Sequence, residues 1–291
     1  MVYAKYFLSE NKPQICPARL KEIIKQALTE DTGREDITTN LTIPKNKQIK
    51  AKIIAKENFL LCGIDVAKEV FKTVDPQLNF VRKVKEGSQL HRKEIIAVIW
   101  GKASSILRAE RVALNLLSLL SGVATKTKEF VKTIEPFKTK ITDTRKTIPG
   151  LRELQKYAVR VGGGYNHRIC LDEMVLIKDN HLKILGGYSK LPTVPYGYKI
   201  EIEAQNLKEF RDALDLKPDI IMLDNMSIQD IKTAVKIRNN TELKNPRTLL
   251  EASGGIHLGN IRKYAATGVE IISIGELTDS VTSVDISLEV T

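Results

Sequence analysis

The feature that most constrains the fold is a regular alternation of strand-like and helix-like segments after residue 138. Short segments rich in β-branched residues lie at 140–145, 174–179, 198–204, 219–225, 248–255 and 271–277. Amphipathic segments typical of helices lie between them at 149–161, 206–215, 227–238 and 258–268. Such alternation indicates βα units around a parallel sheet. Six strands in series favour a barrel or near-barrel over two dinucleotide-binding halves. The G-x-G-x-x-G fingerprint is also absent, because the glycines at 162–164 follow a helix-like segment.

The first 122 residues follow a different pattern. A helical face is expected at 17–30, and residues 48–101 favour strands with one helix between them, as in a small α/β or mainly antiparallel module. Residues 103–121 are almost wholly apolar except for a stripe at helical spacing, formed by Arg108, Arg111, Asn115 and Ser118. This stripe is either the exposed face of a buried helix or a face turned toward a polar cavity or a subunit boundary.

Composition narrows the functional classes. The 291 residues carry 46 Lys and Arg against 35 Asp and Glu, a formal net charge of +11. This charge suits either nucleic acid or a small anionic substrate, but only 5% of residues are aromatic and none interleave with basic residues as in a base-stacking surface. No apolar run could span a bilayer, and the N-terminus lacks the pattern of a secretion signal. Three widely spaced cysteines exclude a disulfide framework. We therefore expect a soluble cytoplasmic protein that binds neither nucleic acid nor membrane.

Polar residues end each expected strand of the second half. In a βα barrel the strand ends form the active-site rim. One polar strand end is commonly just a solvated terminus, but six on one rim are harder to explain that way. The residues concerned are Arg145, Lys146, Lys178, Asp179, Asn180, His181, Glu203, Asp224, Asn225, Ser253, Gly254, Gly255, Ser273 and Gly275.

These residues sort by chemistry. Arg145, Lys146, Arg168 and Lys178, hereafter the cation set, suit carboxylates and phosphates, and His167 is adjacent to Arg168. The carboxylates of the expected third and fourth strands suit Mg²⁺ or ribose hydroxyls. The glycines after the last two strands offer backbone N–H groups, and the corresponding loops of barrels commonly bind phosphate. The sequence therefore indicates a site for anionic substrates.

Several long segments resemble the quinolinate phosphoribosyltransferases, also called carboxylating nicotinate-nucleotide pyrophosphorylases. The similarity covers about residues 20–290 and is carried by ALTEDTGREDITT, AERVALNLLSLLSGVAT, TDTRKTIPGLRELQKYAVRVGGGYNHR, LIKDNHL, EIEAQNL, IIMLDNM, LEASGGI and ISIGELTDSVTSVDISLEV. It implies an N-terminal open α/β sandwich domain at 1–122 and an incomplete, seven-stranded TIM-like α/β barrel domain at 123–291. The C-terminal tail could then pack back on the N-terminal domain.

The resemblance also implies a reaction and roles for single residues. Quinolinate and phosphoribosyl pyrophosphate would give nicotinate mononucleotide, CO₂ and pyrophosphate with Mg²⁺, in a homodimer or a hexamer. Lys146, Lys178, Glu203 and Asp224 are the expected catalytic residues, and the two acids would serve the ribose and, directly or through water, the metal. Arg111 would reach the neighbouring subunit's site. The expected substrate-binding residues are Arg111, Thr144, Arg145, Lys146, His167, Arg168, Lys178, Glu203, Asp224, Ser253, Gly254, Gly255 and Gly275.

Some residues depart from the family pattern. Cys170 replaces a usual glycine, Ala204 and Gln205 replace a valine and an acidic residue, and Glu276 replaces a small residue beside the expected phosphate loop. None of these removes a residue with an expected role. Two alternatives stay open: a molybdenum-operon relative of the same fold, against which the complete cation set argues, and a basic nucleic-acid-binding protein.

Overall fold

The computed structural model describes residues 15–191, 197–241 and 248–291, which divide into two compact units. The sandwich unit comprises residues 15–128, Ile148–Gly163 and Ser280–Thr291, and the barrel unit comprises Glu129–Thr147 and Gly164–Asp279. The expected domain boundary between residues 122 and 123 lies inside one helix, α4 (Ala103–Thr133), and stays a prediction.

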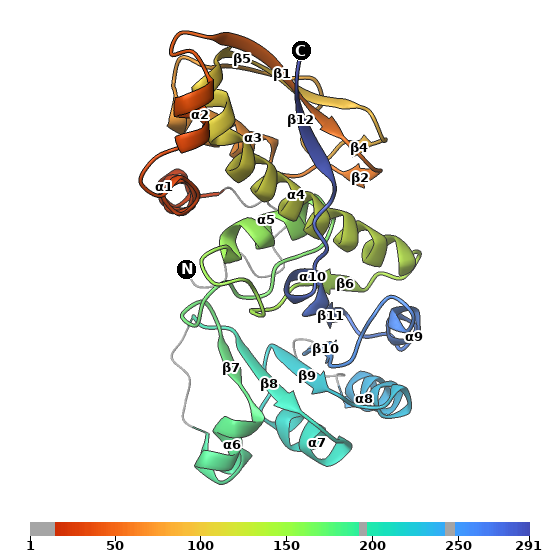
Figure 1. The fold of residues 1–291 in the computed structure, drawn as a ribbon. Helices are drawn as coiled ribbons and strands as arrows, with labels where there is room; N and C mark the ends of the chain where they lie inside the picture. Colours follow the sequence, from red (N-terminus) through yellow and green to blue (C-terminus); the bar gives the residue numbers. More distant parts are fainter. Residues whose placement is uncertain (1–14, 192–196, 242–247) are drawn as a thin grey trace. The chain divides into compact units, whose positions relative to one another are not determined.

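The sandwich unit is built on a four-stranded antiparallel sheet in the order β12-β1-β5-β3 (Figure 1). Its strands are β1 (Gln48–Ala55), β3 (Asn79–Arg82), β5 (Ile95–Lys102) and β12 (Ile286–Val290), and β2 (Phe59–Leu60) pairs with β4 (Gln89–Leu90). Its helices are α1 (Pro17–Thr32), α2 (Ile37–Thr42), α3 (Ile64–Val74), α5 (Arg152–Val161) and most of α4. The last strand of the chain therefore lies beside the first strand of this unit.

Alternating burial explains why β1 forms a strand. Ala51, Ile53 and Ala55 are fully buried on one face, whereas Lys50 on the other face is exposed. Helix α3 contacts α1 and places the ring of Phe71 5.8 Å from that of Phe80. The predicted mixture of strands and one helix at 48–101 is therefore confirmed.

Helix α4 is longer than the sequence suggests and keeps its polar stripe outward. Arg108, Arg111 and Asn115 are exposed, and Ser118 is half-buried. Most other positions along the first five turns are buried apolar residues. Among the described helices none is both long and apolar enough to cross a membrane.

The barrel unit has a parallel sheet in the order β6-β11-β10-β9-β8-β7 (Figure 1). The strands are β6 (Lys140–Thr142), β7 (Val175–Ile177), β8 (Ile200–Ala204), β9 (Ile220–Asp224), β10 (Leu249–Ser253) and β11 (Ile271–Ser273). The helices are α6 (Asp179–Leu185), the 3₁₀ turn η1 (Tyr188–Lys190), α7 (Leu207–Asp215), α8 (Ile228–Thr241), α9 (Ile261–Ala265) and α10 (Glu276–Asp279). All six predicted strands are present and each is shorter than expected. Strand β8 begins two residues late, and the other five end one to four residues early, where their polar ends leave the sheet.

The barrel is incomplete, as expected. In the described residues the edge strands β6 and β7 are not paired with each other. Where a seventh strand would lie, Tyr165 makes a single parallel bridge to Thr142 of β6. At the other end of the interior, Met174, Ile220 and Ile271 form a buried cluster with Leu249 packed against it. Three of these are the first residues of their strands, so apolar side chains fill the amino end and leave the carboxyl end for polar groups.

Candidate active site

Strand register brings the predicted acids to one face of the barrel sheet. Glu203 of β8 lies opposite Met222 of β9, and Asp224 lies two residues further along β9. Ser253 of β10 lies opposite Asp224. Because side chains alternate along a strand, these polar groups share one face at the carboxyl ends of neighbouring strands. The rim inferred from the sequence therefore exists for these residues.

A lysine–glutamate pair occupies one side of this rim. Lys178, which precedes α6, places Nζ 3.2 Å from Oε2 of Glu203. The glutamate side chain is 6% exposed, whereas the lysine side chain is 47% exposed. The lysine thus compensates a buried negative charge and still presents its ammonium group toward solvent, where an anionic ligand could approach.

The second acid is held by its neighbour in the chain. The Nδ2 group of Asn225 donates to Oδ2 of Asp224 over 3.0 Å, and the backbone N–H of Asn225 donates to the carbonyl of Ser253 over 2.9 Å. Asn225 has a φ of 54°, which is uncommon for a residue other than glycine. A Cβ at Gly254 would lie 2.2 Å from Oδ1 of Asn225, so only glycine fits. Asn225 was expected among the polar residues at the strand ends but was assigned no role in the site, and these contacts show that it positions Asp224.

The loops after β6 and β11 also meet. The Thr278 hydroxyl donates to the carbonyl of Lys146 over 2.7 Å, and a Cβ at Gly275 would lie 2.9 Å from Oδ2 of Asp279 and 3.0 Å from Cδ of Lys146. The Thr144 hydroxyl accepts from the Lys146 N–H over 3.0 Å. An exposed lysine therefore lies over the glycine of the expected phosphate loop, a suitable arrangement for a phosphorylated ligand.

His167 and Arg168 are nearly buried, with 4% and 6% of their surface exposed. The Arg168 guanidinium donates to the carbonyl of Met174 over 3.0 Å. Burial lowers the pKa of Arg168, and the neighbouring Arg145 charge lowers it further. This proximity places two arginines of the cation set together, and a dianionic ligand would relieve their repulsion.

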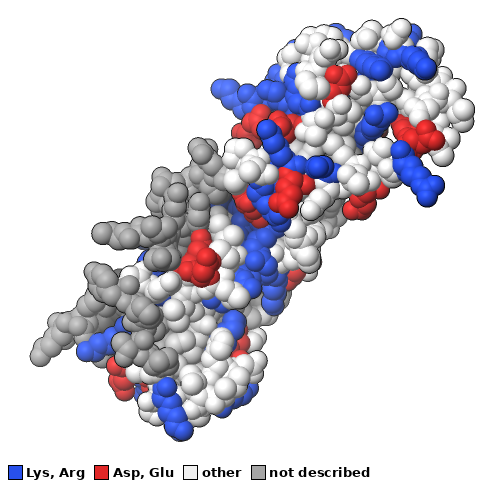
Figure 2. All heavy atoms as spheres, turned by 90° about the vertical axis from the view of Figure 1, so that its left-hand side faces the viewer, with Lys and Arg blue, Asp and Glu red and all other residues white. Residues whose placement is uncertain are grey.

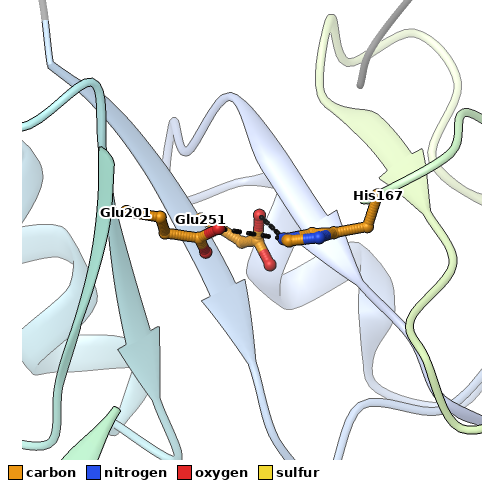
Figure 3. Close-up of side chains that lie close together, drawn as sticks. All are labelled: His167, Glu201 and Glu251. Atoms are coloured by element: carbon orange, nitrogen blue, oxygen red, sulfur yellow. Dashed lines mark ion pairs between the residues drawn. The ribbon is translucent and has the colours of Figure 1, made fainter. Parts of the chain in front are cut away.

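Both ring nitrogens of His167 face protein groups rather than open space. Nδ1 accepts the backbone N–H of Arg168 at 2.9 Å, and Nε2 lies 3.0 Å from Oε2 of Glu201 and 3.6 Å from Oε2 of Glu251 (Figure 3). The predicted substrate role of His167 stays a prediction, and its ring faces two acids, Glu201 and Glu251, that the sequence reasoning missed. For Glu201 a signal was available in the alternation Glu201-Ile202-Glu203, which puts it on the same strand face as Glu203.

The barrel unit contains every predicted site residue except Arg111. The contacts described above give the surroundings of four of these residues, Glu203, Asp224, Lys146 and Arg168. The substrate role of each residue stays a prediction. Arg111 lies on the exposed stripe of α4 in the sandwich unit. On the face drawn in Figure 2, acidic side chains lie among the basic ones. The net charge of +11 therefore does not by itself indicate that this protein binds a polyanion such as nucleic acid.

Comparison with known protein families decides the assignment. The family model for the C-terminal domain of quinolinate phosphoribosyl transferase matches residues 123–289, and the model for its N-terminal domain matches residues 36–121. The chain belongs to the quinolinate phosphoribosyltransferase family.

Individual members of the quinolinate phosphoribosyltransferase family are similar over nearly their whole length. The chain is 43% identical over 276 residues to a probable carboxylating nicotinate-nucleotide pyrophosphorylase of Methanocaldococcus jannaschii, covering 92% of this chain and 96% of that protein. The identity to the corresponding Synechocystis protein is 40%, over 86% of this chain and 85% of that protein. The solved nicotinate-nucleotide pyrophosphorylase of Francisella tularensis superposes with a TM-score of 0.89 at 38% identity, covering 97% of this chain and 100% of that one. The expected fold class and family are therefore confirmed.

Proposed function

We propose that this chain transfers the phosphoribosyl group of phosphoribosyl pyrophosphate to quinolinate, with loss of CO₂, and so forms nicotinate mononucleotide for NAD biosynthesis. Family membership over residues 36–289 is the observation that carries this proposal. The barrel supports it independently, because cations and glycine loops gather where its parallel strands end.

The charges of the substrates match those of the site. Quinolinate carries two carboxylates, and Arg145 lies close enough to Arg168 for its charge to lower the pKa of Arg168. Arginine can bind a carboxylate with two parallel hydrogen bonds, so this pair would orient the pyridine ring. The loop Ser253-Gly254-Gly255 and Gly275 would receive the 5′-phosphate on backbone N–H groups.

Position and electrostatics would provide most of the catalysis. The C1′–oxygen bond to pyrophosphate breaks as the pyridine nitrogen forms the new C1′–N bond. The resulting positive nitrogen accepts the electron pair of the bond to the neighbouring carboxylate, CO₂ departs, and a proton takes its place on the ring carbon. The exposed ammonium of Lys178, anchored on Glu203, is suitably charged to hold an anionic group during this sequence.

Mg²⁺ fits the acids of the rim. Glu203 and Asp224 offer hard carboxylate oxygens on one face of neighbouring strands, and each has one oxygen next to a protein donor that fixes its orientation. These residues would hold the ion directly or through water or ribose. Bound there, Mg²⁺ would stabilise the charge of the departing pyrophosphate.

The direct test is turnover. Purified protein with quinolinate, phosphoribosyl pyrophosphate and Mg²⁺ should release CO₂ and form nicotinate mononucleotide in equal amounts. Omission of any one component should stop both. If neither product forms with folded protein, the function is wrong, and salt-sensitive binding to nucleic acid would then favour the other class.

We also propose a cytoplasmic homodimer, or a hexamer built from such dimers, in which Arg111 serves the partner's site. Arg111→Ala and Lys178→Ala proteins should each be nearly inactive. In a hybrid dimer one site would then be intact and the other would carry both changes. Random mixing makes half of the dimers hybrid, so activity should recover to roughly a quarter of wild type in a two-fold dimer with shared sites. Verified subunit exchange without recovery would rule out the sharing.

A further inference from the structure

Two glutamates inside the barrel have no role in the chemistry described so far. Glu201 and Glu251 are 0% exposed, and with His167 they bring ligand-type atoms within 4.8 Å of one another. Their polar neighbours in the described chain include Nε2 of His167, which faces both carboxylates, and Ser273, which faces Glu251. Figure 3 shows the imidazole pointing at both acids, which come from β8 and β10. Such a cluster would suit a metal ion or a shared proton.

The tautomer of His167 distinguishes these two possibilities. A neutral imidazole has one lone pair, and here Nδ1 uses it to accept the backbone N–H of Arg168 at 2.9 Å. The ring proton then resides on Nε2, the atom that faces the glutamates at 3.0 and 3.6 Å. An Nε2–H group is a donor and cannot coordinate a metal, so the ring geometry favours protons.

The charge of the acids agrees with this geometry. Two buried carboxylates beside one neutral imidazole would repel each other without a compensating charge. Burial raises the pKa of Glu251 to about 8, and the charge of Glu201 contributes in the same direction. Glu251 therefore keeps its proton at neutral pH, and the Glu201 carboxylate, 3.0 Å from Nε2, faces the ring proton of His167.

The ring in turn holds the segment that carries Arg168. Asp143 accepts the backbone N–H of His167 at 2.9 Å, and His167 accepts that of Arg168. The Arg168 guanidinium is fixed on the carbonyl of Met174. A rotation of the imidazole would therefore remove the acceptor of the Arg168 N–H and displace an arginine of the cation set.

We propose that Glu201 and Glu251 are positioning residues that fix the Nε2–H tautomer of His167 and thereby hold Arg168 in place for quinolinate. The inference rests on the proposed function for the identity of the ligand. The tautomer itself can be measured without any activity.

The first experiment is spectroscopic. The chain has four histidines, so nitrogen NMR of protein labelled at histidine gives few signals, and His167→Asn assigns one of them. We expect His167 to have a lone pair at Nδ1 and a proton at Nε2. Glu251→Gln should keep this pattern, because an amide can replace a protonated acid as donor, whereas Glu251→Met should alter it. An Nδ1–H tautomer in the wild-type protein would overturn the proposal.

The second experiment separates positioning from stability. Glu251→Met should raise the KM for quinolinate on the order of 10- to 100-fold. The KM for phosphoribosyl pyrophosphate should change less than about threefold, and Glu251→Gln should restore the quinolinate KM. If Glu251→Met does not fold, Glu251→Asp replaces it, because it keeps the acid but withdraws it by one methylene. An unchanged quinolinate KM would overturn the proposal.

Glu270→Gln is the matched control. Glu270 pairs with the fully buried Arg238 at 2.9 Å and directly precedes β11, at the amino end of the strands. This variant should lower Tm and leave the quinolinate KM unchanged.

Equal increases in both KM values for Glu251→Met would indicate a merely structural role. A metal site would be indicated instead by two results together. The quinolinate KM would rise as much in Glu251→Gln as in Glu251→Met, and purified wild-type protein would contain one equivalent of a divalent metal. If the wild-type protein has no activity, the proposed function is wrong, and the NMR experiment still tests the tautomer of His167 independently.

Discussion

Replacement of Gly254 by alanine tests whether the loop after β10 and the acid after β9 are mechanically linked. Gly254 has a φ of +94°, and a Cβ there would lie 2.2 Å from Oδ1 of Asn225. Gly255, the next residue, has a φ of +60° and no atom within 4 Å of the corresponding position. The two glycines therefore differ mainly in their surroundings: an alanine at position 254 would force the Asn225 side chain to move, whereas an alanine at position 255 would meet open space.

The expected magnitudes follow from this difference. A left-handed backbone costs an L-residue roughly 1–2 kcal/mol, which is the whole expected loss of unfolding free energy for Gly255→Ala. Gly254→Ala adds the cost of forcing a side chain into filled space, about 1–3 kcal/mol. Thermal or denaturant unfolding should therefore show that Gly254→Ala is the more destabilised variant.

The functional effect should be larger than the effect on stability. Asn225 donates to Oδ2 of Asp224 over 3.0 Å, so its displacement should disturb the acid proposed to serve the ribose and metal. We expect kcat/KM for phosphoribosyl pyrophosphate to fall on the order of 100-fold in Gly254→Ala, because small displacements at a reacting centre are costly. Release of CO₂ from carboxyl-labelled quinolinate, measured at varied donor concentration, gives this value.

A double-mutant cycle identifies the cause. Asn225→Gly removes the obstructing side chain and tolerates the φ of 54° observed at that position. In this background Gly254→Ala should cost little more unfolding free energy than Gly255→Ala does in the wild type. Equal destabilisation by the two alanines in the wild type, or no relief by Asn225→Gly, would refute the proposed link.

Three further expectations concern substrate choice, the acids and pH. Nicotinate, which lacks the second carboxylate, should be a very poor substrate, because an unpaired buried cation costs on the order of 2–5 kcal/mol; comparable turnover of nicotinate and quinolinate would contradict the proposed pairing. Asp224→Ala should impair use of the sugar donor, whereas calorimetry without donor should still detect quinolinate binding, and loss of that binding would exclude the assigned role. Glu251 has an ordinary pKa of 4.5, raised by burial to about 8, so the folded state binds more protons between these values and stability should fall as pH rises across that window. Glu251→Gln should show a flatter pH dependence of unfolding, and equal slopes would argue against a protonated acid.

The sequence predicts much of the barrel because its strands and helices have distinct periods. The segments β8, β9 and β10 lie inside the predicted ranges, and their terminal polar residues lie on the rim as expected. Strand length is less predictable, because the residue at which a side chain leaves the sheet depends on its tertiary partners. Arg145, for example, was placed at a strand end but lies three residues beyond Thr142, where β6 ends.

The interior acids show where sequence reasoning fails. A glutamate within a strand normally indicates a solvent-facing position. Glu201 and Glu251 are instead fully buried, and only the register and the His167 contacts show why. Those contacts join β8, β10 and the loop after α5, which are far apart in the chain. A local alternation can place Glu201 on the same strand face as Glu203, but no local pattern shows that Glu201, Glu251 and His167 meet.

The depth of each acid in the barrel then determines what it can do. Glu203 lies two residues beyond Glu201 on the same strand face, about 7 Å closer to the rim. At the rim it meets a lysine that is 47% exposed, whereas the deeper acid faces the buried ring of His167 and lies beside Glu251. If both deep acids were ionised, they would neutralise two charges of the cation set and weaken its attraction for a dianion. A proton on Glu251 removes one of these negative charges below the rim, so that more of the positive charge above stays available to the substrate.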